Sequence, residues 1–123
     1  MLYMLLLYHD PSMPEPEDVM DRHFAVEKEA RERDAYIVSE ALQPVETATS
    51  VRHKDVKTTI TDGPFVETKE VFGGFYVLDC KNLDEAIEYA KKLPETVNGG
   101  VEIRPVFNVP GWPYTIAADR RGA

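Results

Sequence analysis

A strand interrupted by two adjacent glycines constrains the fold of this chain more than any other feature. Residues 61–79 read TDGPFVETKEVFGGFYVLD, which joins a turn at 62–64, a charged segment and an apolar strand containing Gly73-Gly74. Glycine supplies backbone angles that other residues avoid, and proline fixes φ and removes a donor, so 62–64 breaks the chain. Because glycine weakens a strand, the glycine pair predicts a β-bulge or a close approach of two backbones.

Two strands of this sequence are apolar on both faces. Residues 3–8 form a continuous apolar run, which is typical of a strand buried on both sides. In the strand 71–78, we expect one face to carry Phe72, Tyr76 and Leu78 and the other to carry Phe75 and Val77. Two helices can cover only one face of such a sheet. The other face therefore predicts contact with a second copy, in a homodimer whose two sheets face each other.

The remaining sequence predicts two helices and further strands around this pair. Apolar residues at helical spacing predict a first helix over about 17–33. Asn82, with Glu85 three residues later, predicts the start of a second helix, which Pro94 ends. Further strands are expected at 36–42 and 101–109, a hairpin at 48–52 and 57–61, and a turn at 98–100. The order β-α-β-(hairpin)-β-α-β predicts an α+β fold, a ferredoxin-like split βαβ sheet with an extra hairpin and both helices on one face.

Length and charge limit the classes of protein to which the chain can belong. Its 123 residues predict one domain over 1–109, followed by a C-terminal tail over 110–123 that docks through Trp112 and Tyr114. A formal net charge of -8 disfavours nucleic acid and anionic membranes, so we expect neither as a partner. The single cysteine, Cys80, favours a reducing compartment and predicts a cytoplasmic protein. We expect Cys80 to be a small half-buried residue rather than a nucleophile, and no spacing predicts a metal site.

His23 is the residue with the clearest potential for catalysis. It falls on the apolar stripe of the predicted first helix and therefore points inward. A histidine beside a carboxylate is a workable general acid/base pair. Asp10, at the end of the first strand, and Glu27, one helical turn beyond His23, are the candidate partners. The alternative is a core histidine that is bonded to a backbone carbonyl.

Other polar and aromatic residues are candidates for binding a substrate. Arg104 lies on an otherwise apolar strand and could hold a substrate carboxylate with two hydrogen bonds, although an ion pair with Glu102 would also explain it. Tyr8 could line a pocket, together with Tyr3, Phe75 and Tyr76, or pack in the core. The sequence contains no glycine-rich nucleotide loop, no P-loop and no nucleophile elbow, so we predict no cofactor.

Several segments together resemble a known family. TDGPF, ETKE, GGFYVLD, LDEAIEYAKKLP and VEIRPV, with SEALQP before the hairpin, closely resemble the DGPF subgroup of the YCII-related proteins over residues 1 to about 107. The resemblance implies the dimeric α/β barrel version of the ferredoxin-like fold. It also implies a cleft with a histidine on the first helix and an aspartate after the first strand, which match His23 and Asp10. One departure is Asp34, where relatives usually place a glycine.

The resemblance implies two different classes of function. One type of family member is a dehalogenase of chlorinated hydroxymuconate-like ring-cleavage products. It predicts a cofactor-independent lyase, isomerase or dehalogenase that acts on small acidic ring-cleavage-like compounds with His23 as acid/base. DGPF members are also encoded beside, or fused to, alternative sigma factors. They predict instead a non-enzymatic regulatory module that binds a ligand or a sigma factor, and the sequence leaves both classes open.

Overall fold

The computed structural model describes residues 1–122, and the predicted order of the main elements is confirmed. The strands are β1 (Leu2–His9), β2 (Tyr36–Ala41), β3 (Thr49–Lys54), β4 (Lys57–Asp62), β5 (Val71–Asp79) and β6 (Gly99–Pro105). The helices are α1 (Val19–Glu32), α2 (Leu83–Lys91), α3 (Glu95–Asn98) and α4 (Ala118–Arg121), with one 3-10 turn, η1 (Val45–Thr47). Of the predicted tail, Ala123 lies outside the described residues.

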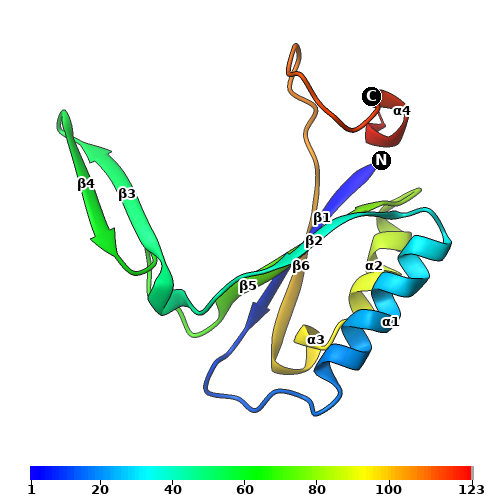
Figure 1. Cartoon of the computed structure of the whole chain (residues 1–123), viewed down its shortest axis with the longest axis horizontal. Helices are drawn as coiled ribbons and strands as arrows, with labels where there is room; N and C mark the ends of the chain where they lie inside the picture. The colour runs from blue at the N-terminus through cyan, green and yellow to red at the C-terminus, as the bar shows by residue number, and fades with distance from the viewer. Residues whose placement is uncertain (123) are drawn as a thin grey trace.

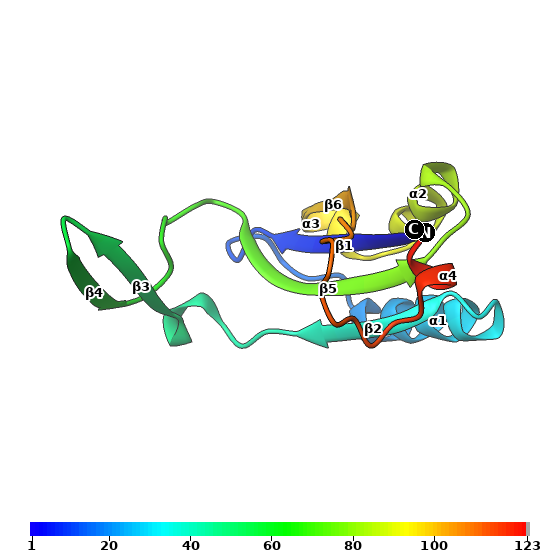
Figure 2. The same cartoon turned by 90° about the horizontal axis from the view of Figure 1, so that it is seen from above.

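Four strands form one antiparallel sheet in the order β2-β5-β1-β6, and β3 pairs only with β4. This order is that of a split βαβ sheet, so the predicted ferredoxin-like α+β fold is confirmed. Figure 1 shows α1, α2 and α3 on one side of the sheet. We call the β3–β4 ribbon, residues 49–62, the arm, and the helix-free side of the sheet the open face. Figure 2 shows that the arm extends well beyond the end of the sheet.

The hydrophobic core lies between the sheet and the helices. Tyr3, Leu5 and Leu7 of β1 are buried on the helix side, whereas Met4, Leu6 and Tyr8, which alternate with them, are only half-buried on the open face. The helices contribute to the core the buried side chains of Val26, Ala30, Ala86, Tyr89 and Ala90. Each large apolar side chain buried in this way stabilises the fold by about 1.5–3 kcal/mol relative to exposure. Within residues 1–122, no helix combines the length and the hydrophobicity that crossing a membrane requires.

The glycine pair forms the predicted bulge. Leu7 pairs with Gly74 and Tyr8 with Phe72, so Gly73 is left without a partner on β1. A Cβ on Gly74 would lie 2.8 Å from the carbonyl oxygen of Glu40, a close approach of two backbones that only glycine allows. The bulge also makes the predicted facing of Phe72 wrong. The extra residue reverses the alternation, so Phe72 lies on the open face, on the same side as Phe75, where its ring contacts that of Tyr8 at a tilt of 52°.

The end of α1 and the start of α2 both have recognisable caps. The side chain of Asn82 accepts a hydrogen bond from the backbone N–H of Glu85 at 3.0 Å, which confirms the predicted start of α2. After α1, Asp34 adopts the left-handed φ of 56° that a glycine would supply. The N–H of Ala35 then donates to the carbonyl of Ala30 at 2.8 Å, as in a glycine-terminated helix. The departure at Asp34 therefore leaves the helix terminator in place.

Two predictions near the C-terminal end of the sheet are wrong. The expected turn at 98–100 does not form, because Asn98 ends α3 and Gly99 already pairs with His9 in β6. The strand then ends at Pro105 instead of 109, because the bond from the N–H of Val106 to the carbonyl of Leu2, at 2.9 Å, is the last one that β1 makes to this segment.

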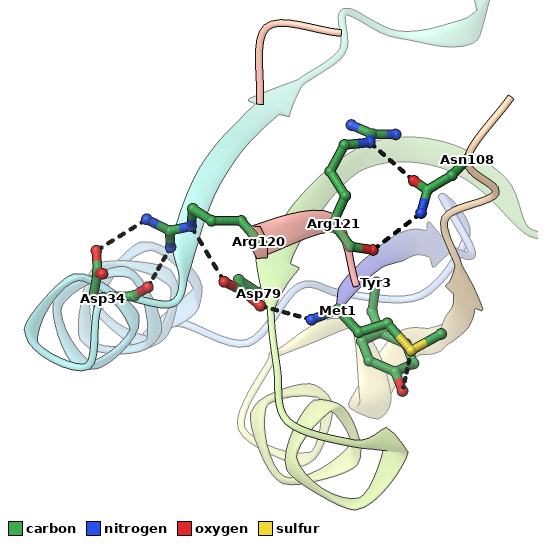
Figure 3. A network of polar contacts seen from close by, with 7 residues as sticks. All are labelled: Met1, Tyr3, Asp34, Asp79, Asn108, Arg120 and Arg121. Carbon is green, nitrogen blue, oxygen red and sulfur yellow. Dashed lines mark hydrogen bonds and ion pairs between the residues drawn. The ribbon is translucent and has the colours of Figure 1, made fainter. Parts of the chain in front are cut away.

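The C-terminal segment docks on the folded body through Arg120. Figure 3 shows Arg120 between two carboxylates, with its guanidinium 3.2 Å from Asp79 and 3.3 Å from Asp34. The Arg121 guanidinium lies over the Tyr114 ring, 3.4 Å from its centroid. Tyr114 thus packs against a residue of its own segment, and Trp112 remains 63% exposed, so docking of the tail through these two residues stays a prediction.

Candidate active site

A cavity of about 470 Å³ lies between α1 and the sheet. Side chains of α1, β2, β5 and α3 surround it, including Met20, His23, Phe24, Ser39, Tyr76 and Glu95. The cavity is open to solvent at one side, which lets a small molecule reach the polar groups inside.

His23 is held by hydrogen bonds at both ring nitrogens. Its Nδ1 lies 2.8 Å from the Tyr76 hydroxyl. Its Nε2 lies 2.9 Å from Oε1 and 3.0 Å from Oε2 of Glu95. The side chains of His23 and Glu95 are 19% and 12% exposed, so the ion-pair geometry forms where water is largely excluded. An imidazole that is hydrogen-bonded at both ring nitrogens cannot rotate freely, so its proton can move only along these two hydrogen bonds.

His23, Tyr76 and Glu95, which we call the triad, come from three separate elements. Tyr76 is on the helix-facing side of β5, at 4% exposure, and points toward α1. His23 comes from the inward side of α1. Glu95 is the first residue of α3, and Pro94 immediately before it fixes the chain at the start of that helix. The proline that was predicted to stop α2 thus also positions the carboxylate partner of His23.

The protonation states of the triad follow from its surroundings. Burial, and next the carboxylates of Glu95 and Glu27, raise the pKa of the Tyr76 phenol, which therefore stays protonated. An ionised Glu95 can only accept hydrogen bonds, so Nε2 of His23 must carry a proton. In the neutral imidazole, Nδ1 is then the acceptor of the Tyr76 O–H. The hydrogen-bond network assigns this tautomer, and it leaves one basic nitrogen next to a protonated phenol.

Asp10 is placed elsewhere than the resemblance implied. It is 3% exposed, and its Oδ1 accepts hydrogen bonds from the Ser12 hydroxyl at 2.7 Å and from the Ser12 backbone N–H at 2.9 Å. These bonds hold the pKa of the Asp10 carboxyl below its usual value. No hydrogen bond links Asp10 to His23 within residues 1–122, so the carboxylate at His23 is that of Glu95. A catalytic role for Asp10 stays a prediction.

The three predicted binding residues are scattered. Glu27 lines the cavity and pairs with Arg31 at 2.9 Å. Tyr8 lies on the open face and borders a second hollow at the base of the arm. Arg104 is an exposed residue of β6 and does not line the cavity of His23. Their roles in binding a substrate stay predictions.

The cavity has an acidic lining. Four carboxylates line it, those of Glu15, Glu27, Glu40 and Glu95. No lysine or arginine among residues 1–122 lines it, and its other titratable groups are the imidazoles of His9 and His23 and the phenol of Tyr76. In this described part of the chain, no three His, Cys, Asp or Glu side chains are arranged to hold a metal ion. Cys80, which we expected to be half-buried, is fully buried at 1% exposure. Burial raises the pKa of its thiol to about 12, which agrees with a packing role.

Comparisons with known proteins relate the chain to one family. The model of the YCII-related domain matches residues 1–110. An uncharacterized protein of Rhizobium meliloti (strain 1021) is 39% identical over 116 residues, which cover 86% of this chain and 92% of that protein. A structure of 5-chloro-2-hydroxyhydroquinone dehydrochlorinase from Burkholderia phenoliruptrix, in complex with 2,5-dihydroxybenzoquinone, aligns with a TM-score of 0.45 at 13% identity. The alignment covers 89% of this chain and 96% of that one.

Proposed function

The chain belongs to the YCII-related family, and on this premise we propose that it is an enzyme that transfers a proton within a small molecule bound in the cavity beside α1. The observation that carries the proposal is the triad, in which His23 is bonded to Tyr76 on one side and to Glu95 on the other. Assignment to the DGPF subgroup and the dimeric α/β barrel form of the fold stay predictions.

The triad can accept and return a single proton. As a substrate C–H or O–H gives its proton to the Tyr76 oxygen, the Tyr76 proton moves to Nδ1 of His23. The resulting imidazolium is stabilised by the carboxylate of Glu95, as in other base–orienter pairs. Return of the proton to a different atom of the substrate completes an isomerisation. Return of the proton to a departing group completes an elimination, and loss of chloride is one such elimination. Lyase, isomerase and dehalogenase reactions therefore share the transfer of a substrate proton to the triad.

The charge of the cavity favours an uncharged substrate. Four carboxylates line the cavity, and no lysine or arginine of residues 1–122 does. The negative charge of each carboxylate would repel a bound anion and weaken its binding. The sequence predicts a small acidic ligand held by Arg104, which lies outside this cavity. We therefore propose a single-ring or ring-cleavage-type compound whose hydroxyl or carbonyl groups bond to the triad. The acidic ligand stays the competing prediction.

The alternative function is a non-enzymatic module that binds a ligand or an alternative sigma factor. Such a module needs a binding surface but no convergent set of proton-transfer groups. Three polar side chains from three elements meet in one cavity here, which favours the enzyme.

Exchange of substrate protons with solvent tests the catalytic role. Hydroxylated ring compounds and their chlorinated and ring-cleaved derivatives would be incubated with the protein in D2O, with NMR detection of deuterium uptake and of released chloride. We expect His23→Gln and Glu95→Gln to lower the rate about 10²–10⁴-fold, the usual contribution of a general acid/base. The control is His53→Gln, since His53 is an exposed histidine of the arm. Equal rates for His23→Gln and the wild type would refute the proposal.

A matched ligand series tests the charge of the substrate. Benzyl alcohol, benzylamine and benzoate share a ring and differ in charge, and binding would be followed through the NMR signals of His23. We expect the alcohol to bind and benzoate to bind at least about tenfold more weakly, with Glu40→Gln narrowing the difference. If benzoate binds best, the acidic ligand predicted from the sequence is supported instead.

A further inference from the structure

The cavity beside α1 is lined by a second histidine, which is not part of the triad. His9, the last residue of β1, is half-buried and lines the cavity together with His23. The N–H of Asp10 donates to the carbonyl of Asn98 at 2.8 Å, so the end of β1 is fixed beside α3. The His9 ring forms no hydrogen bond with another side chain of residues 1–122, in contrast to the ring of His23. Its nitrogens are therefore free to bond to a molecule in the cavity.

The bulge at Gly73 makes room for the His9 ring. A Cβ on Gly73 would lie 3.0 Å from Nδ1 and 3.1 Å from Cε1 of His9, which is tighter than nine in ten real contacts of a Cβ. Gly73 is not among the glycines with a positive φ, so its backbone conformation does not itself require glycine. The missing side chain instead leaves the space that the His9 ring occupies at the cavity.

His9 and Tyr76 line the cavity from two separate positions on the sheet. Tyr76 is opposite Leu5 in the register of β1 and β5, and His9 is four residues farther along β1. A strand rises about 3.3 Å per residue, so positions 5 and 9 are about 13 Å apart along β1. Because side chains alternate along a strand, both positions face the helix side. The phenol and the imidazole can therefore contact one small molecule from two directions.

Removal of a proton by the triad creates a negative charge that the cavity must stabilise. When a C–H beside a carbonyl loses its proton, the charge builds up on the carbonyl oxygen, and a hydrogen-bond donor at that atom lowers the barrier. The four carboxylates of the lining repel this charge, and in their ionised form they cannot donate a proton. Tyr76 and His23 hold the proton that has been removed. Among the titratable groups of residues 1–122 that line the cavity, His9 remains as the donor.

On the basis of the proposed function, we propose that His9 is a second catalytic residue, the acid that protonates the carbonyl oxygen of the substrate. The substrate is then an uncharged carbonyl compound with an enolisable C–H bond. That bond breaks, its proton passes to the Tyr76 oxygen and its electron pair forms a C=C bond. The π electron pair of the carbonyl moves to the oxygen, which takes the proton of the His9 imidazolium. Return of one proton to carbon and of the other to His9 restores both groups.

Deuterium exchange into cyclohexanone, an uncharged ring with one carbonyl, tests the acid. The protein would be incubated with cyclohexanone in D2O, and NMR would follow deuterium uptake at the carbons beside the carbonyl. We expect His9→Gln to lower the rate about 10²-fold, because an amide can bond to the oxygen but cannot give up a proton. His23→Gln should also lower it, through loss of the base. His53→Gln, in the arm, is the matched control, and the urea midpoint of each variant checks its folding.

Gly73→Ala tests the same role without changing the histidine. The added Cβ displaces the His9 ring, so we expect the exchange rate to fall several-fold. In a His9→Ala background the same substitution should have no further effect on the rate, because the ring that it displaces is absent. An equal loss in both backgrounds would show that Gly73→Ala acts by narrowing the cavity, and would contradict the proposal.

Contact between His9 and the ligand is measured separately from turnover. The chain has three histidines, so ¹⁵N-labelling of histidine gives three pairs of ring nitrogen signals. On titration with cyclohexanone we expect the signals of His9 and His23 to shift together, while those of His53 stay unchanged. A shift at His23 without one at His9 would overturn the proposal.

The exchange rates separate this proposal from the proposed function on which it rests. Slower exchange in both His9→Gln and His23→Gln supports the pairing of acid and base. Slower exchange in His23→Gln, with a wild-type rate in His9→Gln, overturns the role of His9 and leaves the proposed function standing. A wild-type protein that exchanges cyclohexanone no faster than buffer does, with no shift at either histidine, overturns both.

Discussion

Two buried tyrosines should respond in opposite ways when their hydroxyl groups are removed. Tyr89 of α2 is 2% exposed, and among the described residues its hydroxyl oxygen is buried without a hydrogen-bond partner. Tyr76 of β5 is 4% exposed, and its hydroxyl is bonded to His23 at 2.8 Å. Phenylalanine keeps the ring of each residue in place. The substitution Tyr89→Phe therefore removes an unpaired polar group, and Tyr76→Phe removes a paired one.

The expected sizes follow from the cost of burying a hydroxyl. An unpaired buried donor or acceptor costs about 1–3 kcal/mol, so Tyr89→Phe should raise the free energy of unfolding by about 1 kcal/mol. A typical hydrogen bond contributes about 0.5–1.5 kcal/mol, so Tyr76→Phe should lower it by about 1 kcal/mol. For a chain of 123 residues, the usual unfolding entropy per residue converts 1 kcal/mol into about 4 °C. The two melting temperatures should then differ by about 8 °C.

Differential scanning calorimetry of both variants at neutral pH measures the difference, and urea unfolding with an unchanged m-value confirms that both remain two-state. Leu93, which is fully buried in the same core, provides a reference, since Leu93→Ala should cost about 2–5 kcal/mol. If Tyr89→Phe destabilises the protein as much as Tyr76→Phe does, the hydroxyl of Tyr89 has a partner and the reasoning fails.

Three further predictions concern other parts of the molecule. Val56 occupies the two-residue turn of the arm with φ at 58°, so Val56→Gly should slow amide exchange across the arm several-fold, and faster exchange would contradict this. Burial raises the pKa of the Cys80 thiol from 9.0 to about 12. Between these two pH values the folded state keeps a proton that the unfolded state loses. The free energy of unfolding should therefore fall as the pH rises from about 9 to about 12. Thermal melts of Cys80→Ala should show a weaker decline over that range, and an identical decline would remove Cys80 as its cause. Arg120→Ala should lower the free energy of unfolding, measured by urea titration, by about 1 kcal/mol, because the guanidinium links Asp79 to Asp34. An unchanged free energy of unfolding would show that these two ion pairs do not stabilise the fold.

The sheet was predictable because its signals are periodic or chemically singular. Apolar runs at 3–8 and 71–78 identify β1 and β5, and Gly73-Gly74 identifies the bulge. The consequence of that bulge was not predictable from alternation alone, because an unpaired residue moves Phe72 to the other face without changing its sequence neighbours.

The site was half predictable. His23 stands out as a polar residue on an apolar helical stripe, and the inward direction of its side chain follows from the helical period. Its partner Glu95 lies in a helix of four residues, which is too short to show any period. The one available signal is Pro94 immediately before it, because proline favours the start of a helix as well as following the end of one. Distance in sequence, 72 residues, hides the pairing itself.

The contact between the two ends of the described chain makes circular permutation practical. A Cβ on Gly122 would lie 3.1 Å from the Cα of Met1, so a linker of a few residues can join these positions without crossing the sheet. Opening the chain between Asp55 and Val56, at the tip of the arm, would make β3 and β4 the new terminal strands while leaving the sheet and the helices continuous. Each strand of the arm could then be shortened one residue at a time, which would separate what the arm contributes from what the folded body contributes.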